Sequence, residues 1–199
     1  MNFDQIALIL VDIQKDFWDP YASEKAFRAF PSNVEKILEK SREKGFTVVH
    51  VKSEFQADRS DWMLFYRPEA RGDIPCIKGK DGTDFTPFSR PNPGEHMVNK
   101  QTFDAFLNTG LYDYLKSRNV RAVLIAGLET SVCVLFTATS AYLRKLVPLV
   151  IEDACADGLE RHERTLGMYN QLSFITVTTE QVLSDFPSVM EIVERFRKY

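Results

Sequence analysis

The chain has 199 residues, of which 44% are hydrophobic and 27% are charged, and this is the composition of an ordinary globular domain. Its formal net charge is −3 and its pI is about 5.7, so the charge balance indicates no nucleic-acid partner, although local arginines still permit an anionic substrate. The first apolar run, residues 6–11, is too short to cross a membrane and lacks a basic leader, so we expect a cytoplasmic protein without a membrane partner.

Short aliphatic or β-branched segments alternate with helical patterns, which predicts a parallel sheet covered by helices. The first strand, residues 7–11, is apolar on both faces, as expected of a central parallel strand. A capping-box pattern at residues 32–35 predicts the start of a helix that runs to Lys44. Gly45 ends this helix before a second strand at residues 47–51, so the first quarter of the chain predicts a βαβ unit.

Residues 52–96 differ from the rest of the chain, because they are rich in glycine and proline and follow no sustained period. A stretch of this length inside a compact domain is usually a functional loop. Its aromatic side chains indicate that it packs against the domain. They are Trp62, Phe65, Tyr66, Phe85 and Phe88.

The second half of the chain continues the alternation of strands and helices. We therefore predict one domain over residues 1–199, with an α/β doubly wound (Rossmann-like) fold and a six-stranded, mainly parallel sheet that has helices on both faces. The predicted strands are residues 97–99, 122–126, 147–151 and 174–177. The predicted helices are residues 104–117, 131–145 and 159–172, with one or two more through residue 182 and residues 189–197.

Three chemically active side chains follow the ends of predicted strands. Asp12 follows the first strand, Lys100 follows the third, and Cys133 lies in the first turn of the helix after the fourth. Ligands of open α/β sheets bind beyond the carboxyl ends of the strands, near the point where the strand order reverses. We therefore expect these three side chains to converge on one site.

The cysteines Cys76, Cys133 and Cys155 form no CxxC pair, so we expect free thiols in a reducing compartment. A helix start and a nearby Lys100 both favour an anion, which predicts a lowered pKa for the Cys133 thiol. Asp12 is placed to accept the thiol proton as a general base. The alternative for Cys133 taken alone is a buried, inert cysteine that packs behind the strand.

A specific combination of motifs runs through the chain: an Asp after the first strand, a Lys ahead of (S/T)-F-x-x-F, and the pattern G-x-x-T-x-x-C-V. The segments are ALILVDIQKDF, VNKQTFDAFLNTGL, AGLETSVCVLFTATSAY and IEDACAD. With these motifs the chain resembles the isochorismatase-like cysteine hydrolase family over about residues 7–178. The resemblance implies a catalytic triad of Asp12, Lys100 and Cys133 that acts on a small-molecule amide.

The resemblance also implies a non-proline cis peptide at Leu128–Glu129 and an oxyanion hole made by the backbone N–H groups of Glu129 and Cys133. By this analogy Cys133 attacks the amide carbonyl, ammonia or an amine leaves, and water hydrolyses the thioester while Asp12 moves protons. Members of the family commonly form dimers or tetramers. The resemblance therefore implies a homo-oligomer, for which the apolar helix over residues 132–146 offers an interface.

The chain departs from its near relatives in one respect. Nicotinamidases of this family bind a metal through an Asp-x-His pair after the second strand and a further histidine. Here the corresponding positions hold Lys52 and Glu54, and residues 51–95 contain no histidine, so we expect no metal, no cofactor and no nicotinamidase activity.

Cys133 also bears on the choice of reaction. The isochorismatase branch cleaves a vinyl ether by acid catalysis and needs no cysteine, so Cys133 favours amide, ureide or imide hydrolysis. A vinyl-ether hydrolase remains an alternative. A catalytically idle binding or scaffold protein is the other alternative.

Candidate substrate contacts follow strand ends or lie in the long loop, where binding residues usually occur. The aromatic candidates are Phe17, Trp18, Trp62 and Phe65. Ordinary packing is an equal alternative for each of them. Four arginines could bind a carboxylate through a bidentate fork, and a surface position is the alternative for each. They are Arg59, Arg67, Arg71 and Arg161.

Overall fold

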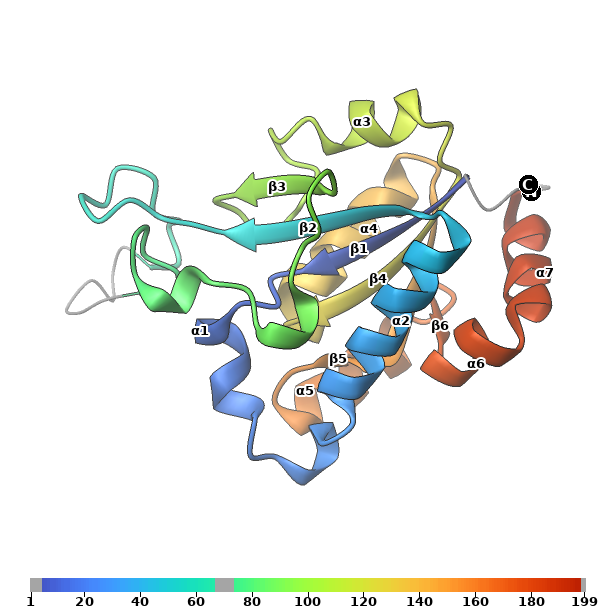
Figure 1. The fold of residues 1–199 in the computed structure, drawn as a ribbon, viewed down its shortest axis with the longest axis horizontal. Helices are drawn as coiled ribbons and strands as arrows, with labels where there is room; N and C mark the ends of the chain where they lie inside the picture. The colour runs from blue at the N-terminus through green and yellow to red at the C-terminus, as the bar shows by residue number, and fades with distance from the viewer. Residues whose placement is uncertain (1–4, 67–73, 198–199) are drawn as a thin grey trace.

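A computed structural model describes residues 5–66 and 74–197. Its centre is a six-stranded sheet in the order β3-β2-β1-β4-β5-β6, and every neighbouring pair of strands runs parallel (Figure 1). The predicted single-domain α/β fold is confirmed, and the sheet is wholly rather than mainly parallel. The strands are β1 (Ile6–Val11), β2 (Thr47–Ser53), β3 (His96–Lys100), β4 (Ala122–Leu128), β5 (Val147–Ala156) and β6 (Ile175–Val177).

Helices cover both faces of the sheet: α2, α6 and α7 pack on one face, and α3, α4 and α5 on the other (Figure 1). In the two described ranges, no helix is long and apolar enough to span a bilayer. The helices are α1 (Lys15–Trp18), α2 (Phe30–Lys44), α3 (Leu111–Ser117), α4 (Leu135–Leu143), α5 (Leu159–Tyr169), α6 (Thr179–Ser184) and α7 (Phe186–Arg197). The 3₁₀ turns are η2 (Asp19–Tyr21), η3 (Lys25–Phe27), η4 (Asp81–Thr83) and η5 (Pro87–Ser89), and η6 (Thr130–Val134) is a π-helical turn.

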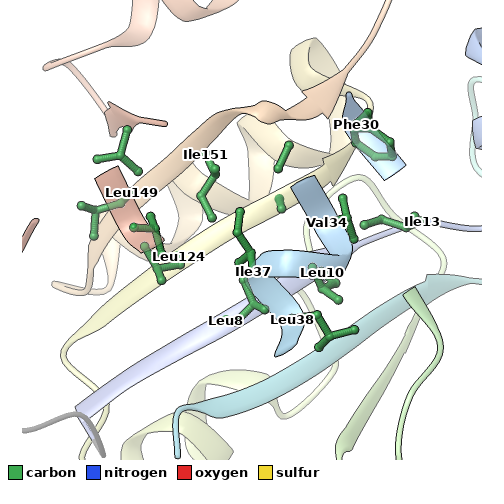
Figure 2. Packing of buried hydrophobic residues seen from close by; sticks show 14 of the residues in the cluster. Leu8, Leu10, Ile13, Phe30, Val34, Ile37, Leu38, Leu124, Leu149 and Ile151 are labelled. Carbon is green, nitrogen blue, oxygen red and sulfur yellow. The ribbon is translucent and has the colours of Figure 1, made fainter. Parts of the chain in front are cut away.

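The core has two layers, one on each face of β1. Leu8 and Leu10 belong to the layer under α2, where they share a cluster with Val34 and Ile37 (Figure 2). Ile9 belongs to the opposite layer, under α3 and α4. Because alternate side chains of a strand point to opposite faces, burial on both sides explains why β1 is a continuous apolar run.

The first long helix begins earlier than its capping pattern predicted. Helix α2 starts at Phe30, Pro31 lies in its first turn, and the Ser32 hydroxyl donates to the Ala29 carbonyl at 3.3 Å. The predicted capping box is therefore wrong, because proline already suits the first helical turn. The predicted end of this helix is confirmed, since Gly45 adopts the left-handed conformation with φ 72°.

The helix predicted from Asp104 is wrong in its first half, and α3 begins only at Leu111. Asn108 and Gly110 have φ values of 59° and 75°, and these left-handed residues interrupt a right-handed helix. The Asp104 carboxylate instead accepts a hydrogen bond from the Phe106 N–H at 2.8 Å and holds a turn.

The segment between β2 and β3 packs beyond the carboxyl ends of the central strands (Figure 1). Its two arms meet where the Phe55 N–H donates to the Cys76 carbonyl at 2.9 Å and the Lys78 N–H donates to the Phe55 carbonyl at 2.8 Å. Phe55, Trp62 and Cys76 are buried together in a third apolar cluster. The expectation that this loop packs against the domain is confirmed for most of its described aromatic residues, while Phe65 is exposed.

Candidate active site

Asp12, Lys100 and Cys133 lie together at the carboxyl edge of the sheet. Lys100 Nζ is 2.6 Å from Asp12 Oδ2 and donates to Cys133 Sγ at 3.4 Å. Asp12 and Lys100 are completely buried, and Cys133 is 7% exposed. The structure therefore brings the three predicted residues into one buried cluster, with the ammonium in contact with both the carboxylate and the sulfur.

The strand order explains why these residues meet. The chain runs outward through β1, β2 and β3 and then crosses back to add β4 on the other side of β1, so the order reverses beside β1. Asp12 follows β1 with φ 51°, in the left-handed region that Asp tolerates better than most residues, and its N–H donates to the Val51 carbonyl at 3.0 Å. Lys100 is the last residue of β3, in register with Ser53 at the end of β2.

The turn after β4 determines where Cys133 lies. The Leu128–Glu129 peptide is cis, as the resemblance implied, and the π-helical turn η6 precedes α4. The Glu129 carbonyl accepts hydrogen bonds from the N–H groups of Val132 and Val134, at 3.0 and 3.1 Å. The helix predicted to start at residue 131 therefore opens with a wider turn. The oxyanion roles of the Glu129 and Cys133 N–H groups stay predictions.

Burial controls the protonation of the Cys133 thiol. Burial raises the pKa of Cys133 far above its ordinary value, the Lys100 ammonium lowers it, and the Asp12 carboxylate raises it through its charge and a hydrogen bond. The predicted lowering of this pKa is therefore wrong, because loss of solvation outweighs Lys100 and the start of the helix. A raised pKa favours the protonated thiol over the thiolate, so its attack on a substrate calls for a base.

Lys100 keeps its positive charge inside the protein. Burial by itself lowers the pKa of Lys100, but the neighbouring Asp12 and Cys133 outweigh burial and raise it above its ordinary value. The Lys100 ammonium also donates to the Thr102 carbonyl at 2.8 Å. A charged Lys100 can therefore stabilise negative charge on either of its two partners.

Two buried polar residues that the sequence did not single out complete the cluster. Ser53 Oγ donates to Asp12 Oδ1 at 3.2 Å and accepts from Lys100 Nζ at 2.9 Å. The Gln14 side chain holds the Ser53 backbone, with Oε1 accepting the Ser53 N–H at 2.8 Å and Nε2 donating to the Ser53 carbonyl at 2.9 Å. The sequence carries no signal for either residue, because the pairing of Ser53 with Lys100 depends on the register of β2 with β3.

The positions that correspond to nicotinamidase metal ligands are paired with each other. Lys52 Nζ lies 2.7 Å from Glu54 Oε2, so the Glu54 carboxylate already has a cationic partner. Within the part of the chain that the structure describes, no three His, Cys, Asp or Glu side chains are grouped so that they could hold a metal ion. The absence of a metal and of a cofactor stays a prediction.

Three of the four aromatic candidates are packed into the domain. Trp18 stacks on Phe30 with ring centroids 4.6 Å apart, in the core layer of α2. Trp62 is buried in the loop cluster, and its indole N–H donates to the Gln56 carbonyl at 2.8 Å. Phe17 is partly buried and packs against both of these clusters. These placements favour a packing role, and substrate contact by the three residues stays a prediction.

The fourth candidate, Phe65, is exposed to solvent. Its ring centroid lies 5.3 Å from that of Tyr66 and 6.2 Å from that of Phe103, and the Phe103 ring lies 5.7 Å from Phe136 on α4. Burial raises the pKa of Tyr66, and the nearby Cys133 raises it further. An aromatic surface formed by Phe65, Tyr66, Phe103 and Phe136 therefore borders the site.

The arginine candidates are separated in the structure. Arg161 Nη2 lies 2.7 Å from the buried Asp157 Oδ1, and its side chain is 59% exposed. The Arg59 guanidinium lies over the indole ring of Trp62, 5.1 Å from the ring centroid. Arg67 and Arg71 lie outside the described residues. Carboxylate binding stays a prediction for all four.

Comparison with known proteins identifies one family and several distant relatives. A model of the isochorismatase domain matches residues 6–181. The ureidoacrylate amidohydrolase RutB of Cronobacter turicensis is 26% identical over 179 residues, covering 76% of this chain and 74% of that protein. A protein of Arabidopsis thaliana named "probable inactive nicotinamidase" is 30% identical over 142 residues, covering 68% of this chain and 71% of that protein. An isochorismatase family protein from Desulfovibrio vulgaris has a crystal structure similar to this chain, with a TM-score of 0.83, 26% identity, and coverage of 92% of this chain and 98% of that one.

Proposed function

Because the chain belongs to the isochorismatase family, we propose that it is a cysteine hydrolase that cleaves the C–N bond of a small amide or ureide. The contact of Lys100 Nζ with both Asp12 Oδ2 and Cys133 Sγ carries this proposal. The similarity to a relative named ureidoacrylate amidohydrolase supports the amide or ureide class. A nucleophile beside a base, with a third group that orients them, is the general arrangement of covalent catalysis.

The first half of the reaction forms a thioester. Asp12 takes the proton from the Cys133 thiol, and the sulfur attacks the carbonyl carbon, so the electron pair of the carbonyl moves to oxygen. The N–H groups of Glu129 and Cys133 donate to this oxyanion. The carbonyl re-forms, the C–N bond breaks, and Asp12 returns the proton to the nitrogen, which leaves as ammonia or an amine.

The second half releases the acid. Asp12, again a carboxylate, takes a proton from water while the water oxygen attacks the thioester carbon. The C–S bond breaks, and the proton returns from Asp12 to the sulfur of Cys133. Lys100 stays protonated throughout and stabilises the charge on whichever partner is anionic, the Asp12 carboxylate or the Cys133 thiolate.

The buried ion pair favours an enzyme over an idle relative. Placing two charges in the interior gives little net stability, because the loss of hydration offsets their attraction. Asp12 and Lys100 are nevertheless both fully buried, directly beside a thiol. An idle protein has no need of this arrangement, although the relative named inactive in Arabidopsis thaliana makes the idle state the alternative to test.

Substrate contact is proposed for the exposed aromatic surface. Phe65 lies at this surface beside Phe103, which is three residues beyond Lys100 in the chain. A flat apolar side chain there can pack against the part of the substrate that is not hydrolysed.

Assembly and location are proposed as well. Tyr142 and Leu143 on α4 are exposed large apolar side chains, and we propose that they lie in a homo-oligomer interface. Light scattering after size exclusion should give a dimer or tetramer, and the variant Leu143→Arg should shift it towards monomer. The three cysteines are free and buried, which supports a reducing, cytoplasmic location.

The test of the proposed function is release of ammonia from ureidoacrylate, maleamate, biuret and several N-carbamoyl amino acids. Wild-type protein should release ammonia from at least one of them, and Cys133→Ala should release none above background. Pyruvate release from isochorismate, without ammonia from any amide, would instead support the vinyl-ether alternative. No turnover of either kind would support the idle protein.

A further inference from the structure

The Gln14 side chain continues the sheet beyond the end of β1. Regular pairing of β1 with β2 ends at Val11 and Val51, with one further bond from the Asp12 N–H to the Val51 carbonyl. Beyond this point the Ser53 N–H and carbonyl bond to the Gln14 amide, at 2.8 and 2.9 Å. The side-chain amide therefore replaces a peptide group of a neighbouring strand.

Gln14 also ties this strand end to the loop above it. Its Nε2 donates a second hydrogen bond, to the Thr83 carbonyl at 2.9 Å, and the whole side chain is buried. The amide thus uses both of its N–H donors and its oxygen in three buried hydrogen bonds. Because buried amides with satisfied partners are rigid, the backbone of Ser53 is fixed at this position.

The Ser53 hydroxyl bridges the two charged residues of the site. A hydroxyl has one hydrogen, and Ser53 gives it to Asp12 Oδ1, so towards Lys100 Nζ the same oxygen is the acceptor. Asp12 Oδ2 is also in contact with Lys100 Nζ, and Lys100 Nζ is in turn in contact with Cys133 Sγ. The hydroxyl, which is buried, closes a ring of contacts that holds the carboxylate in one orientation.

We infer that Ser53 is a positioning residue of the reaction, and that Gln14 holds it in place. The hydroxyl keeps the Asp12 carboxylate and the Lys100 ammonium aligned for proton transfer with Cys133, without touching the substrate. This inference rests on the proposed function. A purely structural Ser53 would affect stability and leave the chemical step unchanged.

The test compares Ser53→Ala with Ser53→Thr, which restores the hydroxyl on a β-branched side chain that suits a strand. Ser41→Ala is the matched control: Ser41 is equally buried, but its hydroxyl has no hydrogen-bond partner among the described residues. With the member of the amide panel that turns over fastest, Ser53→Ala should lower kcat at least about tenfold with KM within twofold. Ser53→Thr should recover most of kcat, and Ser41→Ala should match wild type.

A second measurement needs no substrate and keeps the inference separate from the proposed function. The rate at which iodoacetamide alkylates Cys133 at pH 8 should change several-fold in Ser53→Ala relative to wild type and Ser41→Ala, because the thiol loses the fixed Asp12 carboxylate and Lys100 ammonium beside it. Thermal unfolding of each variant shows that it is folded. Unchanged kcat and alkylation in folded Ser53→Ala, a change confined to KM, or no recovery in folded Ser53→Thr would overturn the inference.

Discussion

Asp12 and Lys100 form an ion pair at 2.6 Å in which neither side chain is exposed to solvent. Such a pair costs much of its own attraction in lost hydration, but removing one partner leaves an uncompensated buried charge. The pair is therefore intolerant of single substitutions.

This relationship predicts the stability of variants at the pair. Lys100→Met should lower the free energy of unfolding by about 3–5 kcal/mol, because the Asp12 carboxylate stays buried without its partner. The double variant Asp12→Asn/Lys100→Met should be more stable than Lys100→Met alone. Urea denaturation measures both. Lys40→Met, which removes a surface pair with Glu43, should cost no more than about 1 kcal/mol.

The raised pKa of Cys133 predicts how its alkylation depends on pH. The folded protein should react slowly with iodoacetamide at pH 7, and the rate should rise with pH through 9 without a plateau, because only the thiolate reacts. Cys133→Ser is the control, because any alkylation that remains in it comes from Cys76 or Cys155. Both should react slowly, since Cys76 is buried and burial raises the pKa of Cys155 to about 12. A rate that levels off below pH 7 would instead indicate that the pKa of Cys133 is lowered, as the helix start predicted.

Glu95 predicts a pH-dependent contribution to stability. Burial raises the pKa of its carboxyl, but hydrogen bonds from Arg42, the Asn92 N–H and His50 outweigh burial and lower it to about 2. The ordinary pKa of this carboxyl is 4.5, so ionised Glu95 stabilises the fold by roughly 3 kcal/mol above that pH. This stabilisation is lost as the pH falls from about 4.5 towards 2.

The variant Glu95→Gln tests this contribution. It should be less stable than wild type at pH 7, and the difference should shrink as the pH is lowered from 5 to 3. Urea denaturation at each pH measures it. Glu43→Gln, at an exposed position, should match wild type throughout. A difference in the free energy of unfolding between Glu95→Gln and wild type that is constant from pH 7 to pH 3 would contradict the lowered pKa of Glu95.

Gly127 on β4 predicts a steric requirement next to Asp12. Its φ is 138°, and a Cβ there would lie 2.0 Å from the Val11 carbonyl oxygen on β1. Gly127→Ala should therefore destabilise the fold by at least about 2 kcal/mol and lower activity. Gly167→Ala is the control, because it lies in α5 with no atom near the added methyl, and it should stabilise by about 0.5–1 kcal/mol. Equal thermal stability of the two variants would contradict the close approach of β1 and β4.

The fold and the grouping of Asp12, Lys100 and Cys133 could be predicted because each depends on local pattern. Apolar strands alternating with helices predicted the sheet, and Asp12, Lys100 and Cys133 were found because each follows a strand end. The capping box failed because α2 already begins at Phe30, with Pro31 in its first turn. Predicting the sheet and this grouping required only the pattern of neighbouring residues and the rule that the carboxyl ends of parallel strands lie at one edge of the sheet.

Other features of the site depend on distant parts of the chain. Ser53 gains its contacts from the register of β2 with β3 and from the Gln14 side chain, neither of which a single sequence displays. The pKa of Cys133 depends on how completely the folded chain excludes water from the thiol, so the helix start alone predicted the wrong direction.

The most direct test of Cys133 as the nucleophile is the mass of the protein after acid quenching during turnover of an amide. Wild type should carry an added mass equal to the acyl half of the substrate, located on the peptide that contains Cys133, and Cys133→Ala should carry no adduct and release no ammonia. Ammonia release from Cys133→Ala at the wild-type rate would contradict the thioester and the role of Cys133.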